Sequence, residues 1–437
     1  MFCLGNKIFL KIYRDIKKIN YQMMSEPFLI KNEIFSVLKG LINKHIKPYI
    51  VRERKINSET FFSLLLNYCL GNETYSSTVI KHNIEKSLEG FEKNTISTGG
   101  FSLSRQRIHY SAFKNIFYDL RDYSMKYEEK YKNINRKSPI ILSGDGSDIF
   151  LDHGFLNKGY GSNNNKFVGV GKLSIVYNTS YELIHDLIIS SNRNERTLLK
   201  QQIDILKEGS IIVLDMGYYS KDLLNELNKK NIHVIFRIQK GYFKKITENK
   251  NDQFLNLSID KKSSINVRIV KYKVHSPEKN SYQEYRLLTT LLNKKKYPLK
   301  TLKEMYFSRW DIEENIKILK SKIHLNKLVS KTENSINQEV YMSGIVSLIT
   351  RILELDTVLY LEKKKEKNIT INEINKTYKV ETSTVINVLK NYYRKFTVSS
   401  LEEFLTFYNC ILNVLGSLIT KKRPNRHFRH EVKGLKK

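Results

Sequence analysis

Cysteine is scarce in this chain of 437 residues, which holds only Cys3, Cys69 and Cys410. The three lie far apart and none belongs to a CxxC pair, so neither a disulfide framework nor a zinc cluster is indicated. The ten histidines form no HxxxH or HxxxxH pair, so each is expected to have a core or surface role. A reducing cytoplasm fits this composition.

Long hydrophobic runs are also missing. No apolar run approaches the roughly 18 residues that a membrane span needs, so we expect no association with a membrane. The opening residues MFCLGNKIFLKIYRDIKK interleave charges with apolar side chains and contain no small-residue cleavage site. This pattern argues against a secretory signal.

Acidic residues are few relative to basic ones. The chain has 75 Lys and Arg against 44 Asp and Glu, a formal charge of 75 − 44 = +31 at pH 7. A compact protein this basic attracts polyanions, which favours nucleic acid or an anionic membrane surface as its partner. Compositional drift in a sequence rich in Lys, Asn and Ile is the alternative, but drift alone leaves acids and bases closer to balance.

The pattern along the chain predicts an α/β protein with helical regions at both ends. The 41% hydrophobic content is enough for real cores, and the length suggests two or three domains. The expected regions are an N-terminal extension (1–25), a helical DNA-binding region (26–135), an α/β core (136–330) with a β-rich insertion (about 241–300), a helical C-terminal region (331–420) and a basic tail (421–437).

The last helix of the N-terminal region is predicted to begin within FSLSRQRIHY. Ser102 or Ser104 can cap it, which places Arg105 and Arg107 in its first turn. Arginines at that position can reach DNA phosphates, and a solvated helix face is the alternative.

The core is predicted to contain strands and helices in the order β-β-β-α-β-α-β. The segments are PIILSGDGSDIF, KLSIVYNTS, YELIHDLIISS, ERTLLKQQIDILKEG, SIIVLD, SKDLLNELNKKN and HVIFRIQKG. Ser220 is the expected N-cap of the second helix. An antiparallel meander that continues into parallel crossover units implies a mixed sheet with helices on its faces. INVRIVKYKV and YQEYRLLTTLL predict further strands in the insertion.

A long helix is predicted from about Leu302 to Ile323, and one stripe of it carries charged residues. Five side chains fall within about 80° of helical arc: Tyr306, Arg309, Glu313, Lys317 and Lys320. A carboxylate flanked by cations suits a site that binds a phosphate backbone and a divalent metal together. A solvated face with pairs such as Arg309 and Glu313 is the alternative. Trp310 can stack on an unpaired base or lie in the core.

Two aspartates end predicted strands upstream of this helix. Asp145 lies in the turn-like LSGDGSD, and Asp215 closes the apolar strand IIVLD. Carboxylates at strand ends are well placed for a site in the crevice of an α/β sheet, although each alone also suits a turn or cap. Together with Glu313 they offer three hard oxygen ligands for Mg²⁺. Asp148, three residues beyond Asp145, is an alternative first ligand.

The spacing on the helix resembles a known signature. Tyr306, Arg309, Glu313 and Lys320 match without a gap the Y-(2)-R-(3)-E-(6)-K run of DDE insertion-sequence transposases, in the branch called insertion sequence family four. DGS at 145–147 and DMGYYS at 215–220 are similar to the first and second Asp blocks of that family. A β-rich insertion precedes the Glu helix in that branch, and 313 − 215 = 98 residues leaves room for one.

The resemblance, which covers roughly residues 100–330, implies an RNase H-like core and a transposase. Such an enzyme cleaves DNA at the ends of its element and transfers the strand into target DNA. The family implies Mg²⁺, or Mn²⁺, held by Asp145, Asp215 and Glu313, with Tyr306, Arg309 and Lys320 near the phosphates. The other contacts expected with DNA are Trp310, Lys317, Arg105 and Arg107.

The resemblance also implies partners and a place in the cell. These are the terminal inverted repeats of its own element, target DNA and a second copy of the chain on DNA. The location is the bacterial cytoplasm, on the nucleoid. The alternatives are a catalytically inactive transposase-derived DNA-binding protein and an RNase H-like nuclease.

Overall fold

A computed structural model gives the fold of the chain. It describes residues 33–51, 55–71, 73–88, 95–132, 138–161, 167–243, 250–261, 263–276, 281–363, 378–396 and 400–421. The predicted N-terminal extension and all but the first residue of the predicted basic tail lie outside these ranges.

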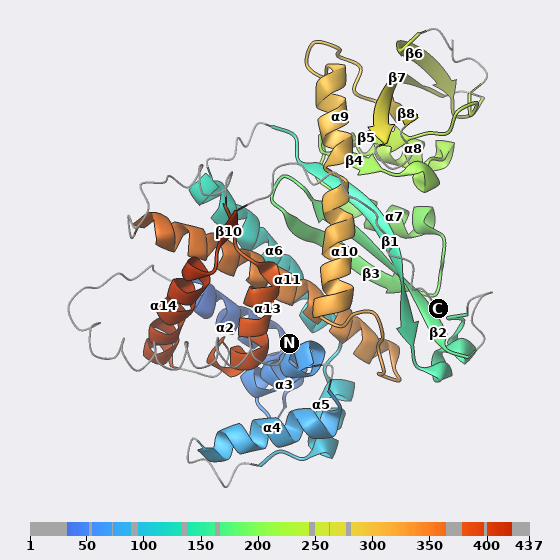
Figure 1. Cartoon of the computed structure of the whole chain (residues 1–437). Helices are drawn as coiled ribbons and strands as arrows, with labels where there is room; N and C mark the ends of the chain where they lie inside the picture. The colour runs from blue at the N-terminus through green and yellow to red at the C-terminus, as the bar shows by residue number, and fades with distance from the viewer. Residues whose placement is uncertain are drawn as a thin grey trace, which may run out of the picture.

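An eight-stranded mixed sheet forms the centre of the molecule, in the order β3-β2-β1-β4-β5-β8-β7-β6 (Figure 1). Its strands are β1 (Ile141–Leu151), β2 (Gly169–Asn178), β3 (Leu183–Ser190), β4 (Ile211–Leu214), β5 (His233–Arg237), β6 (Asp252–Ser258), β7 (Ser264–Ser276) and β8 (Ser281–Thr289). The first three strands are antiparallel, whereas β1, β4 and β5 run parallel. This order confirms the predicted mixed sheet and is that of an RNase H-like core.

Helices cover both faces of the sheet, as predicted. One face packs against α7 (Glu195–Gln202) and α8 (Lys221–Lys229). The other packs against α6 (Ser111–Lys132), α9 (Leu299–Phe307), α10 (Trp310–Lys322) and α11 (Glu333–Lys363). Ser220 caps α8, since its hydroxyl accepts a hydrogen bond of 3.1 Å from the Leu223 amide. The side chains of a strand alternate between these two cores.

That alternation decides where β1 and β4 present their side chains. Leu142 and Leu214 pack into the core under α7 and α8. Ile149 and Val213, which lie at odd-numbered positions, pack on the opposite face. Odd-numbered residues of both strands therefore face the side covered by α9, α10 and α11.

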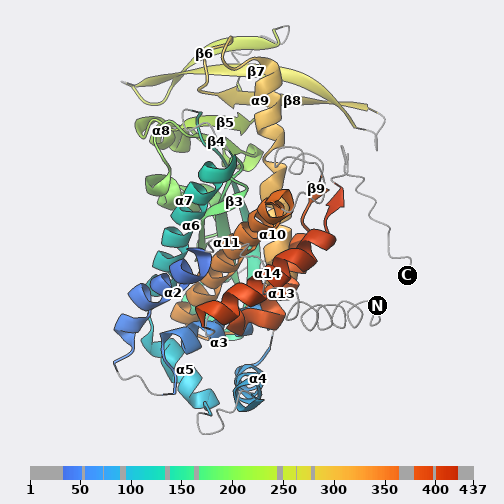
Figure 2. The same ribbon diagram turned by 90° about the vertical axis from the view of Figure 1, so that its left-hand side faces the viewer.

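The β-rich insertion extends the same sheet. Strands β6, β7 and β8 pair antiparallel, and β8 joins the edge of β5. They lie at one end of the molecule, far from helices α4 (Tyr75–Leu88) and α5 (Thr98–Arg107) (Figure 2). The segments predicted for β7 and β8 are strands, but β6 was not predicted. Its sequence, DQFLNLS, has only Gln253 and Leu257 buried, so its hydrophobic pattern is weak.

The long helix predicted after the insertion is two helices, α9 (Leu299–Phe307) and α10 (Trp310–Lys322). Ser308 and Arg309 interrupt it, yet both keep right-handed helical dihedral angles, with φ of −63° and −56°. The two helices therefore follow nearly one line across the sheet (Figure 1). The residues predicted to share one face of a single helix therefore still lie on nearly the same side of α9 and α10.

The helical regions at the two ends of the chain pack together. The N-terminal helices are α2 (Glu33–His45), α3 (Ser58–Gly71), α4 (Tyr75–Leu88), α5 (Thr98–Arg107) and α6 (Ser111–Lys132), and the C-terminal ones are α11 (Glu333–Lys363), α13 (Thr382–Tyr392) and α14 (Leu401–Ser417). Phe35 of α2 stacks on Phe404 of α14, with ring centroids 4.4 Å apart. One continuous hydrophobic core includes helices of both regions and the outer strands of the sheet. The N-terminal helices are thus not a separate unit, because their apolar faces are covered by helices from the other end of the chain.

Among the described residues, no helix is both long enough and apolar enough to cross a membrane.

Candidate active site

The two aspartates lie where two parallel strands separate. The register between β1 and β4 ends at the pair Gly144 and Leu214, and Asp145 and Asp215 are the next residues on each strand. Neighbouring strands lie roughly 4.8 Å apart. Residues 145 and 215 share the odd-numbered face, so both carboxylates are directed toward α9 and α10. The fold therefore places two acidic groups, 70 residues apart in sequence (215 − 145), at one fork in the sheet.

Asp145 lies inside a strand and not in the turn that the sequence predicted. β1 continues through DGSD to Leu151, because β2 pairs with it over its whole length, including Asp145 with Ile175. Two glycines make this possible. A Cβ at Gly144 would lie 2.7 Å from Leu214 Cδ2, and one at Gly146 would lie 2.9 Å from Glu195 Oε1. The glycines that looked like turn residues instead allow close packing against β1.

Glu313 comes to the same place from α10. It lines an open pocket of about 530 Å³ together with Asp145, and helix residues Lys317 and Lys320 border that pocket. The helix is held over the sheet because Ile312, Ile316 and Leu319 are buried against it. After α10 the chain returns to β1: the Phe150 amide donates to the Asn326 carbonyl, at 3.1 Å, and the Leu328 amide donates to the Phe150 carbonyl, at 2.8 Å.

Arg309 is the electrostatic link among the three carboxylates. Its Nη2 lies 2.8 Å from Glu313 Oε1, and its side chain is only 7% exposed. Burial would lower the pKa of Arg309, but Tyr306, Asp215 and Glu313 together raise it. The same guanidinium opposes the rise in the pKa of Asp145. One cation therefore interacts with all three acids.

Tyr306 holds the second aspartate. Its hydroxyl donates a hydrogen bond of 3.1 Å to Asp215 Oδ1, and the ring is only 2% exposed. Burial, followed by the charge of Asp215, raises the pKa of Tyr306 to about 12, so the group stays protonated and keeps donating. A direct contact between Tyr306 and DNA does not fit this burial. Its position makes it the partner of Asp215.

The charged form of Asp145 is disfavoured by its surroundings. Burial raises the pKa of Asp145 to about 6, and the neighbouring Glu195 and Glu313 carboxylates add to the rise. The Gly146 amide, which donates to Asp145 Oδ1 at 2.8 Å, and Arg309 oppose it. A buried carboxyl whose pKa is raised, with other carboxylates beside it, is typical of a place where a cation stabilises the ionised form.

The donor set fits a divalent ion, although the acids do not form a ready-made cage. Within the described ranges, no three His, Cys, Asp or Glu side chains stand close enough together to hold a metal. Asp145, Asp215 and Glu313 nevertheless supply only carboxylate oxygens, the ligands that Mg²⁺ and Mn²⁺ accept. Each of them is engaged by a group of the protein, namely an amide, a phenol and a guanidinium.

The remaining residues predicted on the helix lie around the pocket at different depths. Lys320 donates to Ser147 Oγ and to the Asp148 carbonyl, both at 3.0 Å. Lys317 is exposed and pairs with Glu314 at 2.7 Å. Trp310 is half-buried, and the Arg309 guanidinium carbon lies 5.6 Å from its ring centroid. Lys320 is thus the ammonium that borders both β1 and the pocket.

Asp148, the alternative first ligand, is directed elsewhere. Its carboxylate pairs with Arg193 at 2.7 Å and with Lys172 at 3.4 Å. Although partial burial would raise the pKa of Asp148, these two cations lower it. As an even-numbered residue of β1 it lies on the α7 side of the sheet, away from Glu313. The geometry therefore favours Asp145.

The burial of Arg105 does not fit the predicted contact with DNA. Helix α5 begins at Thr98 with Ser97 as its cap, so Arg105 and Arg107 lie in the last turn and not the first. Arg105 is 1% exposed and leaves no surface for a phosphate. Its side-chain contacts are Gln338 Oε1 (3.0 Å), Tyr75 Oη (2.6 Å), Ser330 Oγ (3.2 Å), the Ser335 carbonyl (2.9 Å) and Glu339 Oε1 (2.8 Å). Arg107 is exposed and stays a predicted contact.

Two residues near Asp145 were missed by the sequence reasoning. Glu195, the first residue of α7, lies against Gly146 and pairs with Lys172 at 2.6 Å. Tyr218 is only 2% exposed. Burial, then the charges of Glu195 and Asp145, raises the pKa of Tyr218. The signal for Tyr218 was its place three residues after Asp215, but Glu195 had none.

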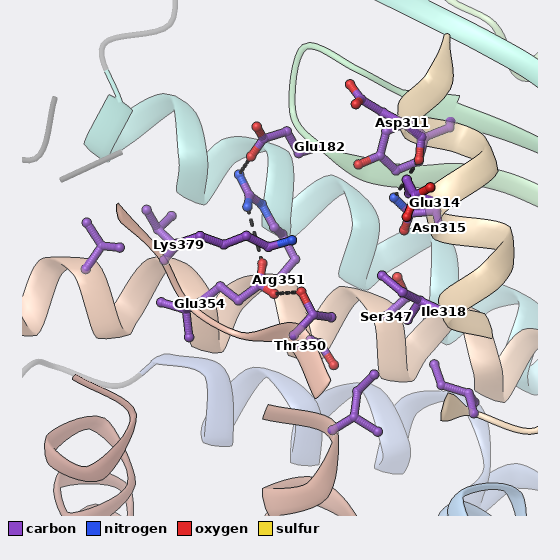
Figure 3. Close-up of a pocket in the computed structure, with 17 residues that line it drawn as sticks. Glu182, Asp311, Glu314, Asn315, Ile318, Ser347, Thr350, Arg351, Glu354 and Lys379 are labelled. Carbon is purple, nitrogen blue, oxygen red and sulfur yellow. Dashed lines mark hydrogen bonds and ion pairs between the residues drawn. The ribbon is translucent and has the colours of Figure 1, made fainter. Parts of the chain in front are cut away.

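A second pocket, of about 360 Å³, lies between α10 and the C-terminal helices. Figure 3 shows Asp311 and Glu314 of α10 on one side and Arg351 and Glu354 of α11 on the other. Arg351 pairs with Glu182 and, at 3.4 Å, with Glu354. Carboxylates outnumber cations here, so a DNA phosphate is not suited to this pocket.

Comparison with known proteins agrees with the geometry. Residues 136–349 match the family described as the transposase DDE domain. A protein of Synechocystis sp. assigned as a transposase for insertion sequence element IS4SA is 29% identical over 159 residues. That match covers 35% of this chain and 44% of the relative, so the chain spans less than half the length of that protein.

A solved structure shows a looser likeness. The piggyBac transposase, in a synaptic complex with hairpin DNA, matches with a TM-score of 0.43 and 11% identity, over 87% of this chain and 83% of that one. Because this TM-score is below 0.5, the fold assignment rests on the strand order. The matched domain spans the fork and the complete Tyr-Arg-Glu-Lys run, so this part of the chain is similar to the transposase DDE domain.

Proposed function

We propose that the protein is a DNA transposase, which cleaves DNA at the ends of its own element and joins them to target DNA. The observation that carries this proposal is the fork in the sheet. Asp145 and Asp215 follow the last paired residues of two parallel strands, and Glu313 shares a pocket with Asp145. The match of residues 136–349 to the transposase DDE domain suggests the class of reaction, and the excess of basic residues suits a DNA partner.

The proposed reaction is two transfers of a phosphoryl group. In the first, a water oxygen attacks the phosphorus at the element's end, the bond to the 3′ oxygen breaks, and that oxygen leaves as a hydroxyl. In the second, this 3′-hydroxyl attacks a phosphorus of target DNA and displaces a target 3′ oxygen. Each step forms one phosphorus–oxygen bond and breaks another, so no further energy source is required.

Asp145, Asp215 and Glu313 would hold a divalent ion, Mg²⁺ or Mn²⁺. Bound there, the ion would lower the pKa of the attacking oxygen and stabilise charge on the leaving oxygen. The chain's own residues prepare the site. Tyr306 fixes the orientation of Asp215, and the ionised form of Asp145 is available above about pH 6.

Arg309 and Lys320 are the residues proposed to bind the phosphates. A guanidinium presents paired donors that match two phosphate oxygens, whereas an ammonium acts as a point charge. Lys317 and Trp310 would lie further out along the same DNA backbone. Arg107 is a candidate for a separate contact, because α5 is distant from the fork (Figure 1).

The substrates are proposed to be the terminal inverted repeats of the element and a target duplex. Two ends must be brought together before joining, so we propose that two copies of the chain act on DNA. Cleavage and joining would take place on the nucleoid, in the cytoplasm, where both DNA partners are found. The N-terminal helices are the proposed DNA-binding region.

The test uses DNA that carries the inverted repeats found beside the reading frame. Glu313→Gln keeps the size of the side chain and removes its charge. We expect end cleavage to fall by about a thousandfold or more, while DNA binding is retained. Glu314→Gln is the matched control, since Glu314 is the next residue of α10 and faces the other pocket; its cleavage should stay within about threefold.

Three outcomes would contradict the proposal. Full cleavage by Glu313→Gln would remove this residue from the site. If the wild-type chain binds the repeats but never cuts them with Mg²⁺ or Mn²⁺, the protein is a DNA-binding relative of transposases. Cutting of hybrid or branched substrates, without preference for repeat ends, would indicate an RNase H-like nuclease.

A further inference from the structure

We infer that Arg309 takes the place of the divalent ion as the positive charge beside Glu313. Arg309 must therefore leave Glu313 before a metal can bind there. This inference rests on the proposed function, because it assumes that Glu313 is a metal ligand. Arg309 would then serve two states of the site. It neutralises the carboxylates in the state described here and becomes available to a phosphate when the metal takes its place.

The contacts of Arg309 support exchange. Its Nη2 is 2.8 Å from Glu313 Oε1, and the pair lies at positions i and i+4 at the start of α10. Glu313 remains partly exposed along the pocket, with 26% of its side-chain surface accessible, whereas the Arg309 side chain is 7% exposed. A metal ion can therefore reach the Glu313 carboxylate from the pocket, whereas the Arg309 guanidinium is buried.

The guanidinium is also incompletely bonded. Arg309 Nε is buried and has no hydrogen-bond partner within the part of the chain that the structure describes. A buried donor without a partner is costly, so such atoms call for an additional acceptor. Arg309 has donors left over for an anion in addition to the ones that contact Glu313.

Metal and guanidinium compete for the same oxygen. A Mg²⁺ ion bound to Glu313 would lie about 2.1 Å from its oxygen. The guanidinium nitrogen at 2.8 Å would then be brought close to a doubly charged ion. Like charges at such a separation repel strongly in a partly buried site. Binding of one cation to Glu313 therefore weakens binding of the other.

Exchange has a consequence for the order of assembly. A DNA phosphate near the fork would draw Arg309 away from Glu313, since phosphate accepts two guanidinium hydrogen bonds. Phosphate and metal would then favour each other's binding, by the reciprocity of linked equilibria. Without DNA the site would hold the metal only weakly. The pair would thus limit cutting to DNA that is correctly seated.

The experiment measures binding of Mn²⁺ without DNA, from the electron paramagnetic resonance signal of the free ion. Arg309→Gln removes the competitor, and we expect the Mn²⁺ dissociation constant to fall by about tenfold. Lys320→Gln is the matched control. It also removes one positive charge from the pocket, but among the described residues Lys320 contacts neutral oxygens and no carboxylate. Its effect should stay within about threefold.

A third variant covers the case in which Arg309→Gln folds poorly. Arg309→Lys keeps the charge and loses the paired donors. It should bind Mn²⁺ more tightly than Lys320→Gln does, and circular dichroism checks its fold. If neither Arg309 variant exceeds the Lys320 control, the exchange is refuted.

Failure of the proposed function has a different signature. Glu313→Gln should weaken Mn²⁺ binding in any background. If Mn²⁺ binding is absent in every variant, or does not depend on Glu313, then the assignment of the metal site itself is wrong. Glu313-dependent binding with no Arg309 effect would overturn the exchange alone.

Discussion

Two buried arginines, Arg105 and Arg309, share a similar partner but differ in how completely they are bonded. Arg105 pairs with Glu339 at 2.8 Å and Arg309 pairs with Glu313 at the same distance. Arg105 also contacts a phenol, an amide oxygen, a hydroxyl and a carbonyl, and it holds helices of both ends together. Arg309 has one nitrogen without a hydrogen-bond partner among the described residues, and its partner Glu313 lines an open pocket.

The difference separates a structural ion pair from a functional one. A buried pair whose donors are all satisfied fixes one arrangement of the fold. A pair whose arginine has an unused hydrogen-bond donor, and which lies beside several carboxylates, can accept another ligand. Burial alone therefore does not tell the two apart, whereas the count of unsatisfied donors does.

The largest expected effect is on the structural member of the pair. Arg105→Met would leave Glu339 buried without its cation, and we expect the free energy of unfolding to fall by about 3–5 kcal/mol. Thermal and denaturant unfolding measure the loss. Arg107→Met, on the exposed side of the same turn, is the control and should change stability by less than about 0.5 kcal/mol. Equal stability of the two variants would contradict the structural role of Arg105.

A second prediction concerns pH, in the helix that supplies Tyr75 to the Arg105 contacts. His82 of α4 is 1% exposed, and burial, then Arg394 and Lys86, lowers the pKa of His82 to about 4. The unfolded chain takes up a proton near pH 6.5, so stability should decrease as pH falls from 6.5 to 4. The loss should approach about 3 kcal/mol.

His82→Gln tests that assignment because it cannot titrate in this range. Denaturant unfolding at pH 7 and pH 4.5 should show a smaller difference in the variant than in the wild type. His109→Gln, at an exposed position, should keep the wild-type difference. An unchanged pH dependence in His82→Gln would show that other groups cause it.

The smallest effect is expected at the rim of the Arg309 site. Lys320→Ala should weaken DNA binding by about tenfold and reduce the slope of log affinity against log salt by about one. Lys322→Ala, on the exposed opposite side of α10, removes an equal charge and should leave the slope nearly unchanged. Equal slopes for the two variants would argue against a phosphate at Lys320.

The sheet was predictable because its signal is local. Runs such as KLSIVYNTS and SIIVLD predict buried strands by their own composition. The alternation of strands with helices then predicts which strands are joined by crossover connections. β6 was missed, because a weakly buried strand has little hydrophobic pattern. The break between α9 and α10 was missed as well, since residues 308 and 309 remain helical in their backbone angles.

The site was predictable only in part. The spacing on the helix placed Glu313, Arg309 and Lys320 on one stripe, and the structure brings the first two together. The burial of Arg105 could not be predicted from the sequence, because its partner Glu339 lies 234 positions away. Tyr306 was expected at a phosphate and instead bonds Asp215, a contact that depends on how α9 crosses β4.

The attachment of α10 has a consequence for how precisely its acid can be placed. At one end Tyr306 is tied to the aspartate after β4, and at the other the chain after the helix is paired with Phe150 of β1. The glutamate sits between two anchors on neighbouring strands of a single sheet. The peripheral helices can then move around bound DNA without altering the spacing of the three acids, because both ends of the segment that carries Glu313 are attached to the sheet.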